Sequence, residues 1–487
     1  MKRLDAAAWP ELVRSGHARA YERAAAASGI VHLGAGAFFR AHAAAYADAV
    51  LASGDLRWGI TGVSLRRPDV RDALRPQGGL YTLLERDNAT LTARVIGSLR
   101  DVLAAPLEGD AVRHALCSPS VHVVTLTITE KAYGLGVDGN LDFADVAIVH
   151  DLRNPQAPRS AVGWLAATLV ARHAAGCAPY TVIACDNLRD NGHTLRRLVL
   201  DYADRAFPAQ AGWIADHVAF PNTMVDRIVP RTTDADRIDA QAAHGFDDAT
   251  PVRCEPFTQW VIETFPGTRP EWERAGALFV DDVRPFEDAK LRLLNAAHTA
   301  LACFGVLLGH ATIAQAAGDP DIAPCVRRLM ADELAPTLAP RRDLDPQAYQ
   351  AMLWPRFTNA ALGHATQQVA TDTSAKLAQR HLPALRERRA RNEPCRGLAL
   401  VIAGWIRYLA GRDENGATYP IDDPLAGPLT TIAASWLSDP SGCVERIFAL
   451  DAVFGSLRDD TAVKQDVARQ LNAIASGGVR AVLRAAC

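Results

Sequence analysis

The sequence predicts an α/β fold with a mostly parallel sheet in the first part of the chain, followed by an all-α domain. The chain has 487 residues, and one hydrophobic core rarely supports that length, so we expect two domains. In the first part, short β-favouring runs alternate with helix-length segments, as in parallel sheets covered by helices. From Pro285 onward, apolar residues recur at helical spacing and few strand candidates remain. We therefore place the domains at 1–284 and 285–487.

The elements of the first domain follow from residue type and from turn residues. Runs of β-branched and apolar residues predict strands, and alanine-rich segments that stop at Gly54 and Gly176 predict helices. Asp87 and Asn88 predict the turn of a hairpin. The predicted elements are a strand at 29–34, a helix at 38–52, a strand at 58–65, a hairpin with strands at 80–86 and 91–99, a strand at 121–129, a helix at 161–175 and a strand at 180–185.

The composition argues against several classes of protein. The formal net charge is −3, whereas a nucleic-acid-binding protein usually has a basic excess, so no nucleic-acid partner is expected. We find no signal peptide and no uncharged apolar run long enough to cross a membrane. The 9 cysteines lack paired CxxC spacing, which argues against a disulfide framework or a structural zinc site and predicts reduced thiols in a cytoplasm. We expect a small-molecule partner, no metal, and either a monomer or a small homo-oligomer.

Gly34-Ala35-Gly36 lies between the first predicted strand and the first predicted helix. In a βα turn of this kind the first glycine permits a tight turn, and the second lets the backbone approach a pyrophosphate. Phe39 stands where the usual fingerprint has its third glycine, so a tight turn without a ligand is the alternative. The favoured interpretation is a Rossmann-type dinucleotide-binding domain, with Phe38 at the start of the following helix included in the site.

The residues after the second predicted strand bear on the choice of cofactor. A carboxylate there binds the ribose hydroxyls of NAD, whereas an arginine accommodates the additional phosphate of NADP. Arg66 and Arg67 follow Leu65, and Asp69 is close enough to contact the ribose. We expect NAD, with NADP possible, and assign Arg66 and Asp69 to the cofactor site; the alternative is that both arginines are only solvated.

One helix carries residue types suited to alcohol oxidation. On a regular α-helix His298 lies about 80° and Asn295 about 140° from Lys290, so the three side chains share one broad face. A lysine can accept a hydroxyl proton, an amide can stabilise the developing oxygen charge, and a histidine can hold a neighbouring hydroxyl. The alternative is an exposed lysine and asparagine with a histidine packed in the core.

A series of ordered motifs resembles the mannitol dehydrogenase family, the long-chain, zinc-independent polyol dehydrogenases. They are GAGAFFRAHAAAYAD from Gly34, GLYTLLERD from Gly79, LTITEKAYG from Leu126, ACDNLRDNG from Ala184, FPNTMVDRIVP from Phe220, EPFTQWVIE from Glu255 and PFEDAKLRLLNAAHTAL from Pro285. The resemblance implies a Rossmann-type domain followed by a helical domain. It also implies that the lysine matching Lys290 is the general base, that Asn187 and Asn295 polarise the reacting oxygen, and that His298 binds substrate.

The same resemblance assigns further residues. It implies that Asp226 organises the substrate pocket and that Glu130 and Glu287 line a path for the proton. Mannitol dehydrogenases usually have arginine where Gln368 stands, and the fructuronate reductase branch is more similar there. The family places Lys376 near the substrate, although a solvated lysine is the alternative. The substrate pair is therefore open between D-mannitol with D-fructose and D-mannonate with D-fructuronate.

Two other functions stay open on the residues alone. Enzymes of the 3-hydroxyacid or 6-phosphogluconate dehydrogenase type also join a Rossmann domain to a helical one, but they usually carry the full glycine fingerprint. A catalytically idle dinucleotide-binding protein is the other alternative, and the complete set of Lys290, Asn295 and His298 argues against it.

Overall fold

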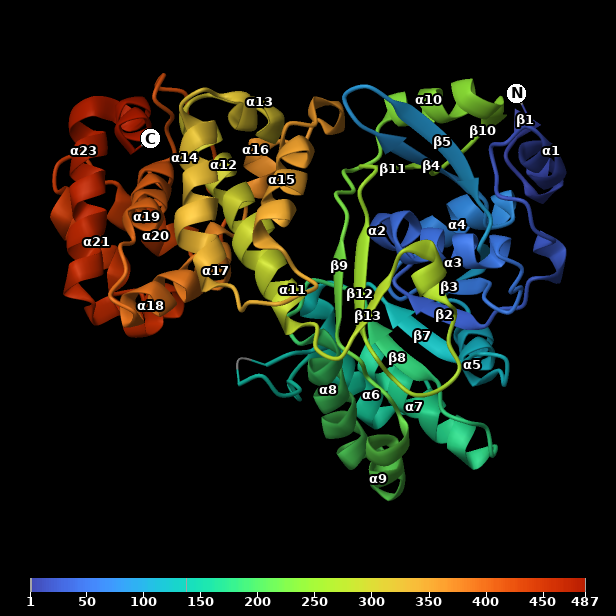
Figure 1. The fold of residues 1–487 in the computed structure, drawn as a ribbon. Helices are drawn as coiled ribbons and strands as arrows, with labels where there is room; N and C mark the ends of the chain where they lie inside the picture. Colours follow the sequence, from blue (N-terminus) through green and yellow to red (C-terminus); the bar gives the residue numbers. More distant parts are fainter. Residues whose placement is uncertain (1, 137, 487) are drawn as a thin grey trace. The chain divides into compact units, whose positions relative to one another are not determined.

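The computed structural model describes residues 2–136 and 138–486, without the side chains of Glu130 and Lys131. It divides into two compact units, Met1–Arg284 and Pro285–Cys487. The first unit contains the sheets, and the described residues of the second unit form helices and no β-strand (Figure 1). The predicted fold class, an α/β domain with a mostly parallel sheet and an all-α domain, is confirmed.

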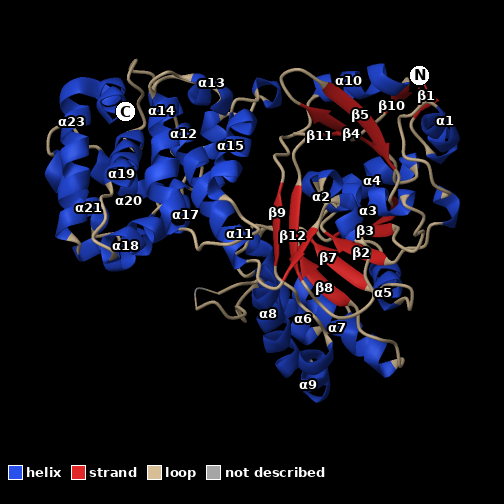
Figure 2. Ribbon diagram, in the orientation of Figure 1, coloured by secondary structure: helices blue, strands red, loops and turns tan. Residues whose placement is uncertain are grey.

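A five-stranded parallel sheet forms the centre of the first unit (Figure 2). Its strand order is β6-β3-β2-β7-β8, and every neighbouring pair is parallel. Nearly every strand residue is buried, which is expected when helices cover both faces of a parallel sheet. The strands are β2 (Ile30–Leu33), β3 (Ile60–Ser64), β6 (Leu99–Ala104), β7 (Val123–Leu126) and β8 (Thr181–Ala184).

Alternate residues of these strands enter two different hydrophobic cores. In β2, Val31 and Leu33 pack in one core with Trp164, whereas Ile30 packs in the other core with Tyr46. This alternation is the period of two that a strand imposes on its side chains. The helices on the first side are α5 (Gly109–Cys117), α7 (Ala161–Ala174), α8 (Asn191–Ala206) and α9 (Pro208–His217), and those on the other are α2 (Ala37–Ala41) and α3 (Ala43–Ala52).

The structure corrects the predicted helix at 38–52, which is in fact two helices. The chain leaves helical geometry at His42, where φ is −119° and ψ is −94°. The His42 ring explains the break, because its Nε2 lies 2.9 Å from the carbonyl oxygen of Gln259 and its face stacks on Phe38. A tertiary contact therefore overrides a local preference for one continuous helix.

The second predicted hairpin strand is also shorter than expected. The hairpin pairs β4 (Tyr81–Arg86) with β5 (Leu91–Ile96), and Leu99 already belongs to β6 of the central sheet. Gly97 separates the two strands because its backbone N–H donates to Asp48 Oδ1 at 2.9 Å and its Cα lies against the ring of Trp9. The sequence prediction therefore merged β5 with the start of β6.

Smaller sheets complete the first unit. Strand β9 (Thr223–Asp226) pairs antiparallel with β12 (Gln259–Glu263), which pairs parallel with β13 (Leu278–Val280). The short strand β11 (Val252–Cys254) extends the hairpin by pairing with β4. These strands lie outside the elements that the sequence predicted, and β9 positions one of the predicted site residues, Asp226, at its end.

In the second unit one buried helix forms the centre. All residues of α12 (Ala296–Leu307) are buried, so the helix is covered on every side. Helices α13 (Ile313–Gly318), α14 (Ile322–Arg328), α16 (Thr366–Val369), α17 (Thr373–Arg380) and α19 (Arg396–Tyr408) pack directly around it. The remaining longer helices include α15 (Pro346–Phe357), α18 (Leu382–Ala390), α21 (Pro440–Phe448) and α23 (Thr461–Ala486).

Candidate active site

The glycine turn after β2 has the backbone geometry that a close approach to a ligand requires. Gly34 has φ +98°, and a Cβ added there would lie 2.2 Å from the carbonyl oxygen of Thr127. Gly36 precedes α2 and donates its N–H to the Gly34 carbonyl at 2.6 Å. An added Cβ at Gly36 would meet only that carbonyl oxygen, at 3.8 Å, so the backbone of Gly36 faces open space.

A stacked pair of rings takes the place of the third glycine in the fingerprint. Phe39 stacks on His32 with ring centroids 3.6 Å apart and an angle of 10° between the planes. The imidazole nitrogens of His32 hydrogen-bond with Thr125 Oγ1 at 2.7 Å and Thr127 Oγ1 at 2.8 Å. Burial lowers the pKa of His32 to about 3, so the ring is neutral. The contact between helix and strand that a glycine usually permits is therefore made by an aromatic stack.

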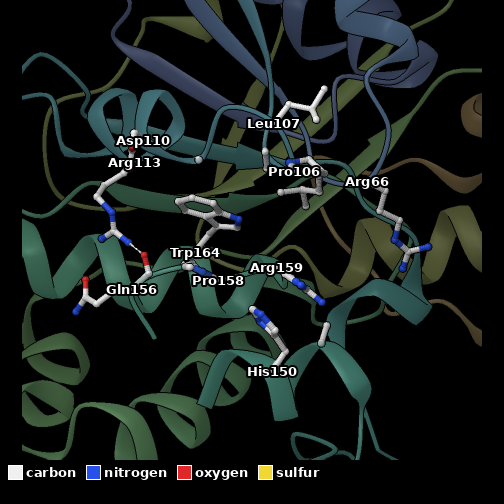
Figure 3. Close-up of a pocket in the computed structure, with 15 residues that line it drawn as sticks. Arg66, Pro106, Leu107, Asp110, Arg113, His150, Gln156, Pro158, Arg159 and Trp164 are labelled. Carbon is white, nitrogen blue, oxygen red and sulfur yellow. Dashed lines mark hydrogen bonds between the residues drawn. The ribbon is translucent and has the colours of Figure 1, made fainter. Parts of the chain in front are cut away.

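The two residues predicted to read the ribose are both exposed. Arg66 follows β3 and lines a cavity of about 650 Å³, together with Arg113, His150 and Arg159 (Figure 3). The Trp164 ring also lines this cavity, so its wall combines three arginines with one aromatic ring and several apolar side chains. Asp69 begins α4 (Asp69–Leu74), and its carboxylate lies 3.6 Å from the Arg67 guanidinium. This edge of the sheet can hold an anionic group with a flat ring beside it.

Asn187 and Asp226 lie on neighbouring segments of the first unit. Asn187 is exposed in the loop after β8, and Asp226 is the buried last residue of β9, 4% exposed. Asn191 links the two segments: its amide oxygen accepts from Thr223 N at 3.0 Å and its amide nitrogen donates to the Ala184 carbonyl at 3.3 Å. The predicted Glu130 begins the 3-10 helix Glu130–Tyr133, but its side chain lies outside the described part of the structure.

The helix with Lys290 departs from the regular geometry assumed in the sequence analysis. Residues Lys290–Asn295 form a π-helix between α11 (Arg284–Ala289) and α12, and Ala296 donates its N–H to the Leu291 carbonyl. Hydrogen bonds in a π-helix span five residues, and such turns occur frequently at functional sites. Residues five apart therefore lie one turn apart on the same side, which brings Lys290 nearer to Asn295 than the predicted angle of about 140° implies.

Arg380 holds the end of this π-helix. Its guanidinium donates to the Asn295 carbonyl at 3.2 Å and to Thr299 Oγ1 at 2.8 Å. Thr299 Oγ1 in turn donates to the same carbonyl at 3.0 Å. The backbone that carries Asn295 is thus fixed by contacts from α17, whereas Lys290 is half-buried and Glu287 is buried one turn before it.

His298 is buried beside a second histidine that the sequence analysis did not single out. The rings of His298 and His364 meet edge to face with centroids 4.9 Å apart, and Phe357 lies 5.5 Å from His298. Burial, and then His364 and Arg380, lower the pKa of His298 well below its usual value. Burial, and then Lys376, lower the pKa of His364 to about 4. Both rings are therefore neutral near pH 7.

Three cationic side chains act electrostatically on His298. Arg356, Lys376 and Arg380 each contribute to the low pKa of His298. Lys376 Nζ donates to the Val369 carbonyl at 2.9 Å and to Thr371 Oγ1 at 3.3 Å. Burial, and then the charge of Arg380, lower the pKa of Lys376 to about 8.

Sequence reasoning found only part of this group. Lys376 was predicted, and Gln368 on α16 is exposed. Arg380 follows Lys376 by one helical turn, and this spacing of four was a usable signal. His364 lies on a loop and Arg356 on a different helix, so no local pattern points to either.

The described residues show neither a metal-binding cluster nor a membrane-spanning helix. No group of three or more His, Cys, Asp or Glu side chains in the described part of the chain is placed to hold a metal ion. Among the same residues, no helix is both long and apolar enough to span a bilayer.

Comparison with known protein families covers both units. Residues 28–274 match the mannitol dehydrogenase Rossmann domain, and residues 282–475 match the mannitol dehydrogenase C-terminal domain. The chain belongs to the mannitol dehydrogenase family. The resemblance inferred from the sequence motifs is confirmed, and the protein is an oxidoreductase of this polyol dehydrogenase family.

Members of the family from bacteria are similar over most of their length. The uncharacterized oxidoreductase YeiQ of Escherichia coli (strain K12) is 42% identical over 443 residues, with 90% of each chain covered. The D-mannonate oxidoreductase of the same strain is 40% identical over 445 residues, again with 90% of each chain covered. The Pseudomonas fluorescens mannitol 2-dehydrogenase, solved as a ternary complex with NAD and D-mannitol, superposes with a TM-score of 0.86 at 37% identity over 99% of each chain.

The glycine turn generates a first prediction for this family member. Gly34→Ala should lower the free energy of unfolding by about 2 kcal/mol or more, because φ is positive and the new Cβ would collide with Thr127. Gly36→Ala is the matched control, since it has φ −74° and open space, and should change stability by less than about 0.5 kcal/mol. Urea denaturation followed by circular dichroism measures the free energy of unfolding of both variants. Equal stability of the two would contradict the tight, positive-φ turn at Gly34.

The lowered pKa of Lys376 generates a second prediction. Between about pH 8 and 10.5 the unfolded lysine binds more protons than the folded one, so the wild-type protein should gain stability as pH rises through this window. Lys376→Met removes the titrating group and should lack this gain, as should Lys376→Arg, which stays charged. The measurement is urea denaturation of all three proteins at several pH values from 7 to 10. Parallel curves for the three proteins would show that the lysine pKa is not lowered.

Proposed function

We propose that the protein is an NAD-dependent oxidoreductase that interconverts a linear sugar acid and its keto form, of the D-mannonate and D-fructuronate type. The choice of a sugar acid depends on Arg356, Lys376 and Arg380, which act electrostatically on the neutral His298. A substrate carboxylate needs cationic or multi-donor partners, and this group supplies them beside the helix of Lys290 and Asn295. The similarity to D-mannonate oxidoreductase supports the same class.

D-mannitol and D-fructose are the second candidate pair. The Pseudomonas fluorescens structure with D-mannitol resembles this chain over 99% of its length and supports a hexitol substrate. Gln368, where mannitol dehydrogenases usually have arginine, is exposed and uncharged, and can donate hydrogen bonds to hydroxyls as readily as to a carboxylate. Membership of this family argues against an enzyme of the 3-hydroxyacid or 6-phosphogluconate type.

The turn after β2 fits a dinucleotide, because the open backbone at Gly36 can approach a pyrophosphate without a side chain in the way. We assign Gly34, Gly36 and Phe38 to this part of the cofactor. The cavity with Arg66 suits the adenosine end. The exposed carboxylate of Asp69, which lies 3.6 Å from the Arg67 guanidinium, would bind the ribose hydroxyls. Held at this turn, the cofactor would supply hydride acceptance in oxidation and hydride donation in reduction.

The catalytic groups of the chain then have separate roles. In oxidation Lys290 accepts the proton of the substrate hydroxyl, and in reduction it returns a proton to the forming alcohol. Asn187 and Asn295 donate amide N–H groups to the reacting oxygen, where negative charge develops. Glu130 and Glu287 pass the proton between the lysine and solvent.

His298 and Asp226 bind substrate hydroxyls in this scheme. The low pKa of His298 fits hydrogen bonding better than proton storage, because the ring stays neutral near pH 7. Among the described residues, His298 Nε2 is buried and makes no hydrogen bond, which leaves it available to a hydroxyl. The cytoplasmic location, the absence of a metal and the oligomeric state stay predictions of the sequence.

A substrate panel tests the proposal. Turnover is measured with D-mannonate, D-mannitol and other hexonates and hexitols, each with NAD and with NADP, before and after treatment with EDTA. We expect the highest kcat/KM with a hexonate and NAD, and no effect of EDTA. A hexitol preferred at least tenfold would favour the second candidate pair, and loss of activity with EDTA that zinc restores would contradict the lysine mechanism.

Lys376→Met tests the carboxylate contact. Loss of a charge-assisted hydrogen bond costs about 1.5–3 kcal/mol, so KM for the hexonate should rise about 10- to 100-fold. KM for the hexitol should change much less, because it carries no charge for Lys376 to bind. Lys376→Arg keeps the charge and should retain most of the hexonate affinity. Equal effects of Lys376→Met on the two substrates would refute this assignment.

Lys290→Ala tests the general base. Removing general-base catalysis should lower kcat by about 10²- to 10⁴-fold. Cofactor binding should persist, because the glycine turn belongs to the first unit, and small external amines should restore part of the activity. Lys464→Ala, on α23, is the control and should keep wild-type turnover. If Lys290→Ala folds and keeps more than about a tenth of the turnover, the base must be another residue.

A further inference from the structure

The loop after β8 carries Asn187, and a carboxylate of the same loop ties it to a buried tyrosine. Asp186 directly precedes Asn187 and is half-buried, whereas Asn187 itself is exposed. One oxygen of this carboxylate, Oδ1, accepts the backbone N–H of Leu188 at 3.0 Å. The other oxygen, Oδ2, accepts the hydroxyl of Tyr133. The carboxylate of Asp186 thus fixes the chain on both sides of Asn187.

Tyr133 is a rigid anchor for this carboxylate. Its side chain is fully buried in the core that also contains Leu141, Ile148 and Ala184. Burial, and then the negative charge of Asp186, raise the pKa of Tyr133 well above its usual value, so the phenol stays protonated and remains a donor. A buried phenol with one good acceptor has little freedom to move.

The same tyrosine belongs to a second predicted part of the site. It is the last residue of the 3-10 helix Glu130–Tyr133, and Gly134, in the left-handed region at φ +69°, ends this helix. One hydrogen bond therefore joins the segment that begins with Glu130 to the loop that carries Asn187. These segments follow β7 and β8, which are neighbouring strands of the central sheet.

We propose that Tyr133 is a positioning residue that acts through Asp186 to hold Asn187 at the reacting oxygen. The proposal rests on the proposed function, in which Asn187 polarises that oxygen. An amide stabilises developing charge only from a fixed place, and a displacement of about 1 Å can cost 10²-fold in rate. The role of Tyr133 is therefore in turnover and not in substrate affinity.

A pair of matched variants tests this role. Tyr133→Phe removes only the hydroxyl, and Tyr180→Phe does the same to a second buried tyrosine. Tyr180 lies at the opposite end of β8, where its hydroxyl donates to the Leu165 carbonyl at 3.2 Å and lies 2.8 Å from Thr168 Oγ1. Both variants should lower the melting temperature. Only Tyr133→Phe should lower kcat, by about 10- to 100-fold with little change in KM, whereas Tyr180→Phe should stay within about twofold of the wild type.

The Asn187→Ala background separates positioning from stability. If Tyr133 acts through Asn187, adding Tyr133→Phe to Asn187→Ala should lower kcat no further. Asp186→Asn keeps the shape of the side chain and should lower kcat as Tyr133→Phe does. It replaces Tyr133→Phe in the test if that variant does not fold. Equal kcat for the two tyrosine variants would overturn the role of Tyr133 but not the proposed function. The same holds if Tyr133→Phe lowers kcat further in the Asn187→Ala background. A wild-type enzyme inactive on every polyol and sugar acid would overturn it together with the proposed function.

Discussion

The burial of a fully parallel sheet is the constraint on which the first unit depends. Both faces of strands β2, β3, β7 and β8 are buried, so helices must cover both sides of the sheet. Because the strands are parallel, each connection must cross back to the amino end of the next strand. Their carboxyl ends therefore lie together, and ligands of such folds bind at this edge. Gly34, Arg66 and Asn187 each follow a strand within three residues of its end. These three candidate residues thus lie in loops that the parallel sheet places at one edge, whereas Asp226 is in strand β9 of another sheet.

The second unit arranges its functional groups by a different constraint. Helix α12 is buried on all sides. Its candidate site residue, His298, lies in the first turn, and Lys290 and Asn295 lie in the π-helix before it. The extra residue in the π-turn changes the face on which Lys290 lies and disturbs the regular hydrogen bonding near Asn295. Arg380 compensates by donating to the Asn295 carbonyl, so the irregular backbone is stabilised by the same cation that lies near His298.

The cationic side chains near His298 repel one another, and this repulsion destabilises the folded state. Lys376 is held with a lowered pKa beside Arg380, and two histidines are kept neutral, which a purely structural core would avoid. Strongly perturbed groups that gather at one place are typical of binding sites. A negatively charged ligand would relieve this repulsion, which is the physical argument behind the proposed sugar-acid substrate. His32 in the first unit differs from His298: it is buried against Phe39, and both of its ring nitrogens are hydrogen-bonded.

The sequence alone determined the alternation of buried strands with helices, the all-α second part, the glycine turn and the family, because these depend on local periodicity and on motifs that are contiguous in the chain. Tertiary structure decided the break at His42, which depends on a contact with Gln259, and the separation of β6 from the hairpin. It also decided the π-turn at Lys290 and the grouping of Arg356, His364 and Arg380 around His298. Residues far apart in the chain make these features, and their energies come from burial and from hydrogen bonds between elements. Apart from the spacing of Lys376 and Arg380 on α17, no local pattern points to these contacts, since each residue involved is equally compatible with an exposed position on its own element.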